Sequence, residues 1–247
     1  MVWQITQPST YCKTLERRMT DLSGWTGCPP VEKIVLEGRL VQLVPLDAKV
    51  HGDDLFTASS MSDADERFLY LPEFAVTDRA EFQTWLERVE QSVDPLFFAV
   101  IEKATGKVAG RQTLMRTVPA HGVTEIGNIF WSSLISRTPA TTEAFYLFAK
   151  YVFDTLGYRR FEWKCNDANE PSKRAALRYG MSAEGVHRQA LVVKGKNRDT
   201  AWFSMLDHEW PLCKQAMETW LSVENFDDGG QQIKRLEDIR SGISRNN

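Results

Sequence analysis

The stretch from Thr124 to Arg188, TEIGNIFWSSLISRTPATTEAFYLFAKYVFDTLGYRRFEWKCNDANEPSKRAALRYGMSAEGVHR, decides the fold. Its first eight residues are apolar and aromatic and predict a half-buried strand. A polar loop over 132–139 follows, and then a helix from Thr141, because apolar residues recur at helical spacing up to Gly157. A strand, a polar loop and a helix start in this order predict an anion site, since free backbone N–H groups and the helix dipole meet there.

A second strand and a second helix complete this unit. The strand is predicted over 158–165, and the helix begins at Pro171 and ends at Gly180. Further elements are predicted from the spacing of apolar residues outside the unit. They are strands over 36–44, 95–102, 108–116, 190–193 and 200–206, one or two short helices within 53–66, and helices over 77–93 and from Glu209. Together these elements predict an α/β protein with a mixed sheet.

The composition is that of a soluble globular protein, with 43% hydrophobic residues, 26% charged residues and a net charge of −3. A weakly acidic chain without a basic cluster predicts no nucleic acid partner. The polar N-terminus predicts neither a signal peptide nor a membrane segment. Four widely spaced cysteines predict reduced thiols and a cytoplasmic protein, and four histidines without ligand spacing predict no metal.

Composition also suggests three parts of the chain. Residues 1–33 are predicted to be an N-terminal extension that is irregular and packed by its tryptophans, or partly disordered. Residues 34–222 are predicted to form the α/β domain, and residues 223–247 a C-terminal helical tail. The tryptophan-rich termini suit a homodimer.

Six motifs occur in an order and at a spacing that resemble one family. They are Glu125-Ile126-Gly127, Thr142-Glu143-Ala144, Leu156-Gly157-Tyr158-Arg159-Arg160, Asn169-x-x-Ser172, Leu177-Arg178-Tyr179-Gly180-Met181 and Glu184-Gly185-Val186. The chain resembles the GNAT superfamily of N-acetyltransferases, and within it the RimJ/RimL-type branch of ribosomal-protein alanine N-acetyltransferases. The resemblance implies the acyl-CoA N-acyltransferase fold, with a mixed, mostly antiparallel sheet splayed at the centre and helices on both faces.

The resemblance implies acetyl-CoA as the acetyl donor, but the phosphate loop departs from the family pattern. The family has Arg/Gln-x-x-Gly-x-Gly/Ala, and this chain has Ser136-Arg137-Thr138-Pro139-Ala140-Thr141, without either glycine. Pro139 has no N–H for a phosphate, whereas Arg137 offers a charged fork in compensation. Such a loop before Thr-Glu-Ala is similar to that of a subgroup resembling the microcin C self-immunity acetyltransferase domain. The alternative is a catalytically silent acyl-CoA-binding or scaffold module.

The residues expected to bind acetyl-CoA come from three segments. The central strand supplies main-chain groups, the loop and helix start supply phosphate contacts, and the Asn-x-x-Ser motif lies near the pantetheine and the sulfur, as the resemblance implies. The full set is Ile129, Phe130, Trp131, Arg137, Thr138, Thr141, Thr142, Asn169 and Ser172.

Acetyl transfer requires a group that protonates the departing thiolate. By resemblance Ser172 is the leading candidate, and Tyr179 is the alternative. The two lie seven residues apart, about two helical turns, so both can face one cleft. A capping role for Ser172 and core packing for Tyr179 are the structural alternatives.

The amine must also lose a proton, and Glu125 is our first choice for the base. On strict alternation Glu125 shares a face of the central strand with Gly127, Ile129 and Trp131. A half-buried carboxylate at that place is suited to this task. A salt bridge from Glu125 to Arg111 or Arg116 is the structural alternative. Glu162 and Glu184 are weaker candidates for the base, and a water chain without a dedicated base is a further alternative.

The predicted reaction is acetyl transfer to a primary amine by direct attack on the thioester. The acceptor is expected to be a small molecule, a peptide or a protein N-terminus. Phe68 and Tyr70, in the aromatic loop after the first helices, and Trp202, on the last strand, are the candidate contacts to the acceptor. Packing in the core is the alternative for these aromatic residues.

Overall fold

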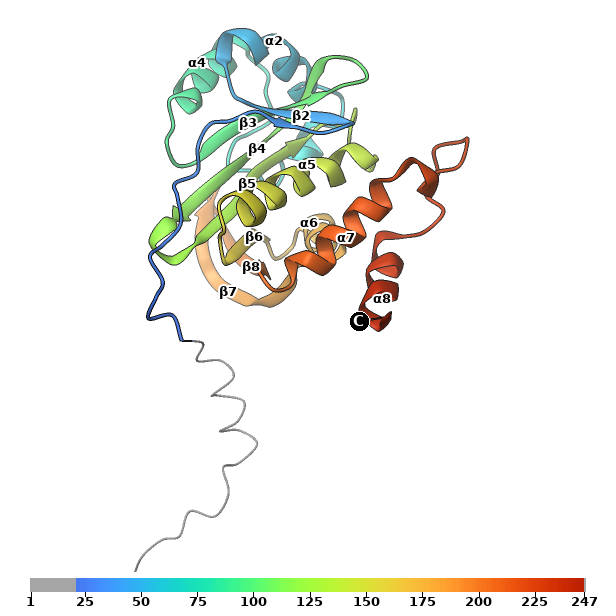
Figure 1. Cartoon of the computed structure of the whole chain (residues 1–247). Helices are drawn as coiled ribbons and strands as arrows, with labels where there is room; N and C mark the ends of the chain where they lie inside the picture. Colours follow the sequence, from blue (N-terminus) through green and yellow to red (C-terminus); the bar gives the residue numbers. More distant parts are fainter. Residues whose placement is uncertain (1–20, 247) are drawn as a thin grey trace, which may run out of the picture.

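The computed structural model describes residues 21–246; Trp3, Cys12 and the rest of residues 1–20 lie outside this range. Eight strands form one mixed sheet in the order β1-β2-β3-β4-β5-β6-β8-β7 (Figure 1). Only β5 and β6 pair in parallel among the described strands, as the predicted fold requires. The bounds are β1 Leu36–Glu37, β2 Val41–Pro45, β3 Leu96–Glu102, β4 Lys107–Val118, β5 Val123–Trp131, β6 Arg160–Asn166, β7 Ser182–Val193 and β8 Lys196–Leu206.

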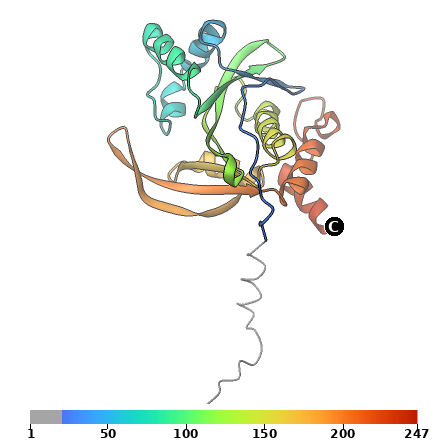
Figure 2. The same cartoon turned by 60° about the vertical axis from the view of Figure 1, so that its left-hand side comes forward.

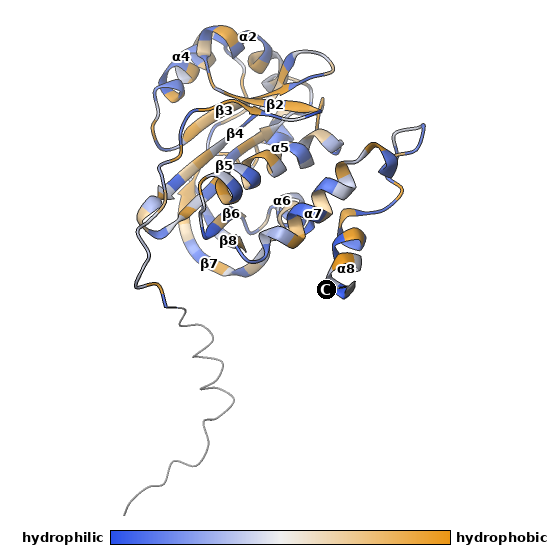
Figure 3. Cartoon of the chain, in the orientation of Figure 1, coloured by the Kyte–Doolittle hydropathy of each residue, from blue (hydrophilic) through white to orange (hydrophobic). Residues whose placement is uncertain are grey.

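Helices cover both faces of the sheet, which confirms the predicted layers (Figure 1). One apolar cluster packs under α2 (Ala48–Ser59), α3 (Ala64–Phe68) and α4 (Arg79–Glu90). The larger cluster lies on the other face, where α5 (Pro139–Lys150) and α7 (Trp210–Leu221) pack. Apolar residues gather on the central strands and along α5 (Figure 3). The remaining α-helices within residues 21–246 are α6 (Glu170–Arg178) and α8 (Leu236–Asn246).

The sheet is splayed between β5 and β6, as predicted. The parallel register runs from Val123 opposite Arg160 to Ile126 opposite Trp163 and ends there. Two residues farther along β5, Asn128 has a φ of 46° and lies in a register shift that sets an additional residue of β5 against β4. Such a bulge bends its strand and increases the local twist. The two halves of the sheet diverge beyond this point (Figure 2).

The prediction of one strand over 36–44 is wrong, because the segment folds back on itself. β1 and β2 pair with each other in antiparallel register, with a turn at Gly38. The buried Glu143 carboxylate holds this turn by accepting hydrogen bonds from the backbone N–H groups of Arg39, Leu40 and Val41, at 3.0, 2.6 and 2.8 Å. A side chain at Gly38 would collide with that carboxylate. Glu143 therefore binds the β1–β2 turn to α5 through these hydrogen bonds.

The last two strands are longer than predicted. β7 and β8 meet at a two-residue turn, Lys194-Gly195, instead of a loop over 194–199. Both turn residues have positive φ, 51° and 71°, as a tight hairpin requires. β7 is an exposed edge strand over nearly its whole length. Its sequence therefore lacks the apolar alternation that would have revealed its extent.

The described part of the N-terminal extension packs against the β4–β5 connection. The Trp25 indole donates a hydrogen bond to the carbonyl of Ala120, at 2.7 Å, and the Cys28 thiol to that of Gly157, at 3.2 Å. Arg159 lies over the Trp25 ring. No helix within residues 21–246 combines the length and apolar character needed to span a bilayer.

We expect Glu143→Ala to lower the free energy of unfolding by about 3 kcal/mol, because it leaves the amides of the β1–β2 turn without an acceptor. Urea denaturation followed by circular dichroism measures the loss. Glu87→Ala, at an exposed position of α4, is the control and should change stability little. Equal midpoints for the two variants would contradict the role given to Glu143.

Candidate active site

A cavity of about 1680 Å³ lies where β5 and β6 separate, and its lining comes from both faces of the sheet. On the α5 face it reaches the start of that helix, with Arg137 and Thr138. On the opposite face it reaches Glu125, Lys164 and Trp202. The cavity therefore joins the two faces through the splayed sheet.

The start of α5 keeps the geometry of an anion site although the glycines are absent. Arg137 has a φ of 61°, the left-handed conformation that usually favours glycine. The Thr138 hydroxyl caps the helix by accepting from the N–H of Ala140, and Pro139 takes the first helical position. The Arg137 side chain is exposed and has no ion pair within residues 21–246. Its charge is available to a ligand at the helix start.

Two arginines of α6 and the C-terminal segment extend this end of the cavity. Arg174 and Arg178 line it, and Arg178 donates a hydrogen bond to the Thr142 hydroxyl, at 2.9 Å. The Arg178 guanidinium also lies over the Trp220 ring, 4.6 Å from its centroid. Residues 230–232, between α7 and α8, form part of the wall. With Arg137, three arginines thus line the α5 end, against the one carboxylate, Glu237, that the C-terminal segment adds to the cavity wall.

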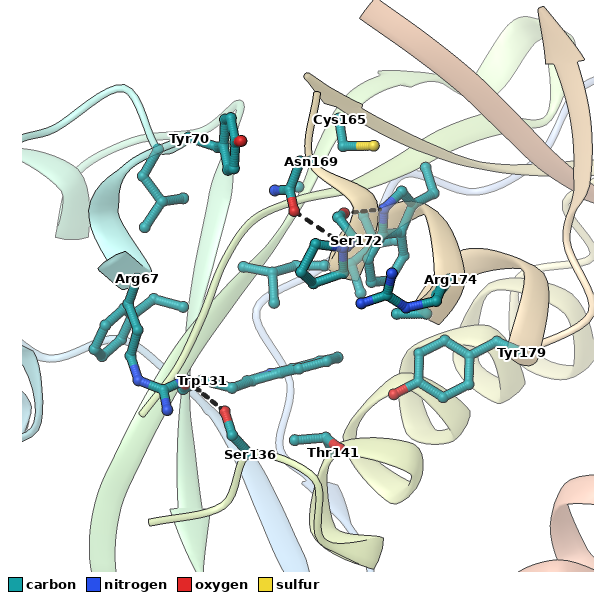
Figure 4. A pocket seen from close by; sticks show the side chains of 18 of the residues that line it. Arg67, Tyr70, Trp131, Ser136, Thr141, Cys165, Asn169, Ser172, Arg174 and Tyr179 are labelled. Carbon is teal, nitrogen blue, oxygen red and sulfur yellow. Dashed lines mark hydrogen bonds between the residues drawn. The ribbon is translucent and has the colours of Figure 1, made fainter. Parts of the chain in front are cut away.

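Trp131 occupies the middle of the cavity and is held from several sides (Figure 4). Its carbonyl accepts hydrogen bonds from Arg67, at 2.9 Å, and from the Ser136 hydroxyl, at 3.0 Å. Its indole donates to Gln112, at 3.1 Å, and meets the Trp163 ring edge-on, at 6.4 Å between centroids. The backbone that leads into the phosphate loop is thereby fixed.

Ser172 lies at the first turn of α6 and faces the cavity (Figure 4). The helix cap is Asn169, whose side chain accepts from the N–H of Ser172, at 3.1 Å. The Ser172 oxygen accepts a hydrogen bond from the Trp163 indole, at 2.9 Å. A hydroxyl polarised in this way donates its own proton more strongly. The capping alternative for Ser172 is therefore not what the structure shows.

Tyr179 both packs in the core and lines the cavity. Its ring is buried and stacks on Phe145, at 4.4 Å between centroids, so it belongs to the core. It nevertheless lines the cavity, and its hydroxyl points toward Thr141 (Figure 4). Burial raises the pKa of the Tyr179 hydroxyl, and the neighbouring Arg178 offsets part of that rise. The hydroxyl therefore keeps its proton at neutral pH.

Glu125 is buried on the face opposite α5 and is ion-paired. Its carboxylate lies 2.8 Å from the Lys164 ammonium and 3.0 Å from the Arg116 guanidinium. Lys164 also pairs with Glu162, at 2.7 Å. The salt bridge to Arg116, one of the alternatives, is thus present, whereas Arg111 pairs with Glu73.

Strict alternation along β5 fails at the Asn128 bulge. Glu125 lies on the face of its ion partner Lys164, whereas Trp131 packs toward Trp163 and α5. The prediction that Glu125 shares a face with Ile129 and Trp131 is therefore wrong, because an additional residue reverses the order of the faces.

Comparisons with known proteins agree with this geometry. The family model described as acetyltransferase (GNAT) domain matches residues 41–182. A GCN5-related N-acetyltransferase from Brucella melitensis is 59% identical, with a TM-score of 0.88, over 89% of this chain and 100% of that one. The chain belongs to the GNAT acetyltransferase family. An acetyltransferase of this family from Chromobacterium violaceum is 38% identical, with a TM-score of 0.72, over 83% of this chain and 98% of that one.

More distant similarity supports the fold alone. An acetyltransferase from Salmonella typhimurium, described as modifying the N-terminal serine of a 50S ribosomal subunit protein, is 16% identical. Its TM-score is 0.61, over 70% of this chain and 99% of that one. No curated protein matches this chain. The assignment of this chain to the GNAT family therefore rests on the family model and the two nearer relatives. Acetyltransferases of this family use acetyl-CoA.

The structure brings most of the predicted site residues of this GNAT protein together. The following predicted residues line the cavity: Glu125, Ile129, Phe130, Trp131, Arg137, Thr138, Thr141, Thr142, Asn169, Ser172, Tyr179, Tyr70 and Trp202. Tyr70 bridges to the β6–α6 loop through a hydrogen bond to Ala168, at 3.0 Å. Phe68 does not line the cavity, because its buried ring packs on Phe130 in the core. The prediction that Phe68 contacts the acceptor is therefore wrong.

Sequence reasoning missed several charged residues of the site. Lys164 is one of them, although Arg160, Glu162 and Lys164 alternate along β6 and so indicate a charged face. Arg174 is another, and it follows the Asn-x-x-Ser motif by two residues. Arg67 lies in a short helix and carries no such signal. Only its tertiary contacts with Trp131 and Ser136 reveal it.

We expect Lys164→Met to lower the free energy of unfolding by about 3–5 kcal/mol, because two buried carboxylates lose their shared cation. Adding Glu125→Gln should restore part of the loss. Chemical denaturation of the single and double variants measures both effects. Lys107→Met, at an exposed position of β4, is the control. A Lys164→Met protein as stable as the control would show that the buried charges are not coupled.

Proposed function

We propose that this protein is an acetyl-CoA-dependent N-acetyltransferase that transfers the acetyl group to a primary amine by direct attack. The observation that carries the proposal is the cavity through the sheet, with cations at one end and a buried carboxylate at the other. The α5 start fits the phosphates of CoA, because Arg137 has no ion pair within residues 21–246 and Arg174 lines the same cavity. Acetyl-CoA supplies the thioester that the amine attacks.

The backbone between β5 and β6 is the proposed place for the pantetheine arm. Past Ile126, the β6 side of β5 has no partner strand among residues 21–246. Main-chain groups of Ile129, Phe130 and Trp131 are therefore suited to pair with the amides of the arm. Backbone N–H groups there would also polarise the thioester carbonyl.

The proton transfers are assigned to groups at the two sides of the splay. The amine gives up a proton on the face of Glu125, either to that carboxylate or through a chain of water. A bond then forms between the amine nitrogen and the acetyl carbon while the carbon–sulfur bond breaks. Ser172 donates a proton to the departing sulfur, and Tyr179 is the alternative donor. The Trp163 hydrogen bond to Ser172 favours the serine.

The acceptor is proposed to be the amine of a small molecule, a peptide or a protein N-terminus. The sequence motifs support the RimJ/RimL-type branch and the subgroup that resembles the microcin C immunity domain. The cytoplasmic location and the homodimer stay predictions.

Calorimetric titration with acetyl-CoA tests the donor site. We expect binding by the parent protein, and binding at least tenfold weaker (roughly 1.4 kcal/mol) for Arg137→Ala, because the variant loses a phosphate contact. Arg88→Ala, an exposed arginine of α4, is the control and should bind as the parent does. Absence of binding by the parent protein would refute the proposed function. Binding without turnover on any amine would indicate the silent acyl-CoA module instead.

Steady-state kinetics with detection of free thiol tests the proton donor. Ser172→Ala should lower kcat by about 100-fold or more, as expected for loss of a general acid, while the acetyl-CoA affinity is kept. Ser182→Ala, at an exposed position of β7, is the control. A large loss in Tyr179→Phe with activity kept in Ser172→Ala would assign the role to the tyrosine.

A further inference from the structure

Strand β8 carries a row of three side chains that line the cavity, and each of them has a buried polar atom without a partner among residues 21–246. Side-chain atoms Nε of Arg198, Oγ1 of Thr200 and Nε1 of Trp202 are buried and make no hydrogen bond with any of the described residues. Residues two apart on a strand share one face, and all three line the cavity. The described residues contain five such atoms, so three of the five lie in this row. This concentration points to a ligand.

The row consists of groups that can donate hydrogen bonds. Arginine Nε and the tryptophan indole are donors only, and the threonine hydroxyl can donate as well as accept. Buried polar groups in folded proteins are nearly always hydrogen-bonded, because an unmade bond costs free energy. The missing partner must therefore offer several acceptor atoms, as an oxygen-rich group does.

The charges on this face of the cavity indicate that the ligand is an anion. On the same face, the Lys164 ammonium is shared by Glu125 and Glu162, and Arg116 pairs with Glu125. Farther along β6, Arg160 pairs with Glu162 and Glu184. Arg198, by contrast, takes part in no ion pair among the described residues. Burial lowers the pKa of its guanidinium, yet arginine stays charged in proteins.

The Trp202 ring is held so that its N–H has a fixed direction. The Lys164 ammonium lies 3.7 Å from the centroid of the ring, and His187 of β7 stacks on it at 4.5 Å between centroids. Trp202 therefore cannot turn its indole toward another partner without losing both contacts. The orientation of the Trp202 ring is therefore set before a ligand arrives, which lowers the cost of binding.

We propose that the acceptor carries an oxyanion, a carboxylate or a phosphate, besides its amine, and that Arg198, Thr200 and Trp202 bind this group. The inference rests on the proposed function, because it takes this face of the cavity as the acceptor side. The amine is then directed toward the splay and Glu125. A site with buried donors discriminates strongly against a ligand that lacks their partner, so neutral amines are expected to be poor acceptors.

Binding of unreactive product analogues tests the proposal without turnover. The probes are a panel of N-acetyl amino acids with their matched carboxamides, and N-acetyl phosphoethanolamine with N-acetylethanolamine as the phosphate arm. Calorimetric titration is carried out with the parent protein, with and without CoA. We expect an acid to bind at least tenfold more tightly than its neutral partner. The set of probes that shows this preference identifies the oxyanion that the site binds as a carboxylate or a phosphate.

Variants of the row must remove that preference. Arg198→Gln should abolish it. Thr200→Val, which keeps the side-chain shape, and Trp202→Phe, which also loses ring volume, each remove one donor and should weaken the preference about threefold or more. Arg188→Gln, at an exposed position of the neighbouring strand β7, is the matched control and should keep the preference. Urea denaturation verifies that each variant is folded.

Two results would overturn the proposal. One is equal binding of acids and neutral partners by the parent protein. The other is a preference that Arg198→Gln keeps in full. Failure of the proposed function is recognised separately, because it appears as loss of acetyl-CoA binding by the parent protein, whatever the probes do.

Discussion

Beyond Ile126 and Trp163, strands β5 and β6 no longer share hydrogen bonds, and the cavity lies in the space between them. The bulge at Asn128 turns β5 away from its neighbour. Arg67 holds the Trp131 carbonyl at the far end of the strand. An unpaired strand edge is costly inside a protein unless a ligand or a side chain satisfies it. The end of the hydrogen bonding between β5 and β6 therefore creates the cavity. It also leaves backbone groups that can pair with the amides of a pantetheine arm.

The splay also separates two kinds of charge. On the α5 face, cations stand at a helix start, where an anionic phosphate is stabilised by the dipole as well. On the opposite face, Glu125 and Glu162 each pair with a cation, whereas Arg198 pairs with no carboxylate within residues 21–246. A second bulge supports this arrangement, because Arg116, with a φ of 48°, reaches Glu125 from β4. The acetyl donor and the amine acceptor can thus approach the splay from opposite faces of the sheet.

The sequence revealed the fold and most of the cavity lining, but not which side chains share a face. The helix starts at Thr138 and Asn169 carry local signals, proline and capping residues, that do not depend on distant contacts. The bulge at Asn128 carries none, so alternation placed Glu125 and Trp131 on the same side. Glu143 likewise acts on a turn about a hundred residues earlier in the chain. Such contacts depend on how distant segments pack and on the strand register, and the local sequence pattern contains neither.

A crystal structure of the protein with acetyl-CoA is the most direct measurement of the central claim. The account predicts the pyrophosphate at the α5 start beside Arg137, the pantetheine between β5 and β6, and the thioester near Ser172. The Glu125 face should remain open to an acceptor. Acetyl-CoA bound away from the splay, or strands β5 and β6 closing on each other without it, would contradict the account.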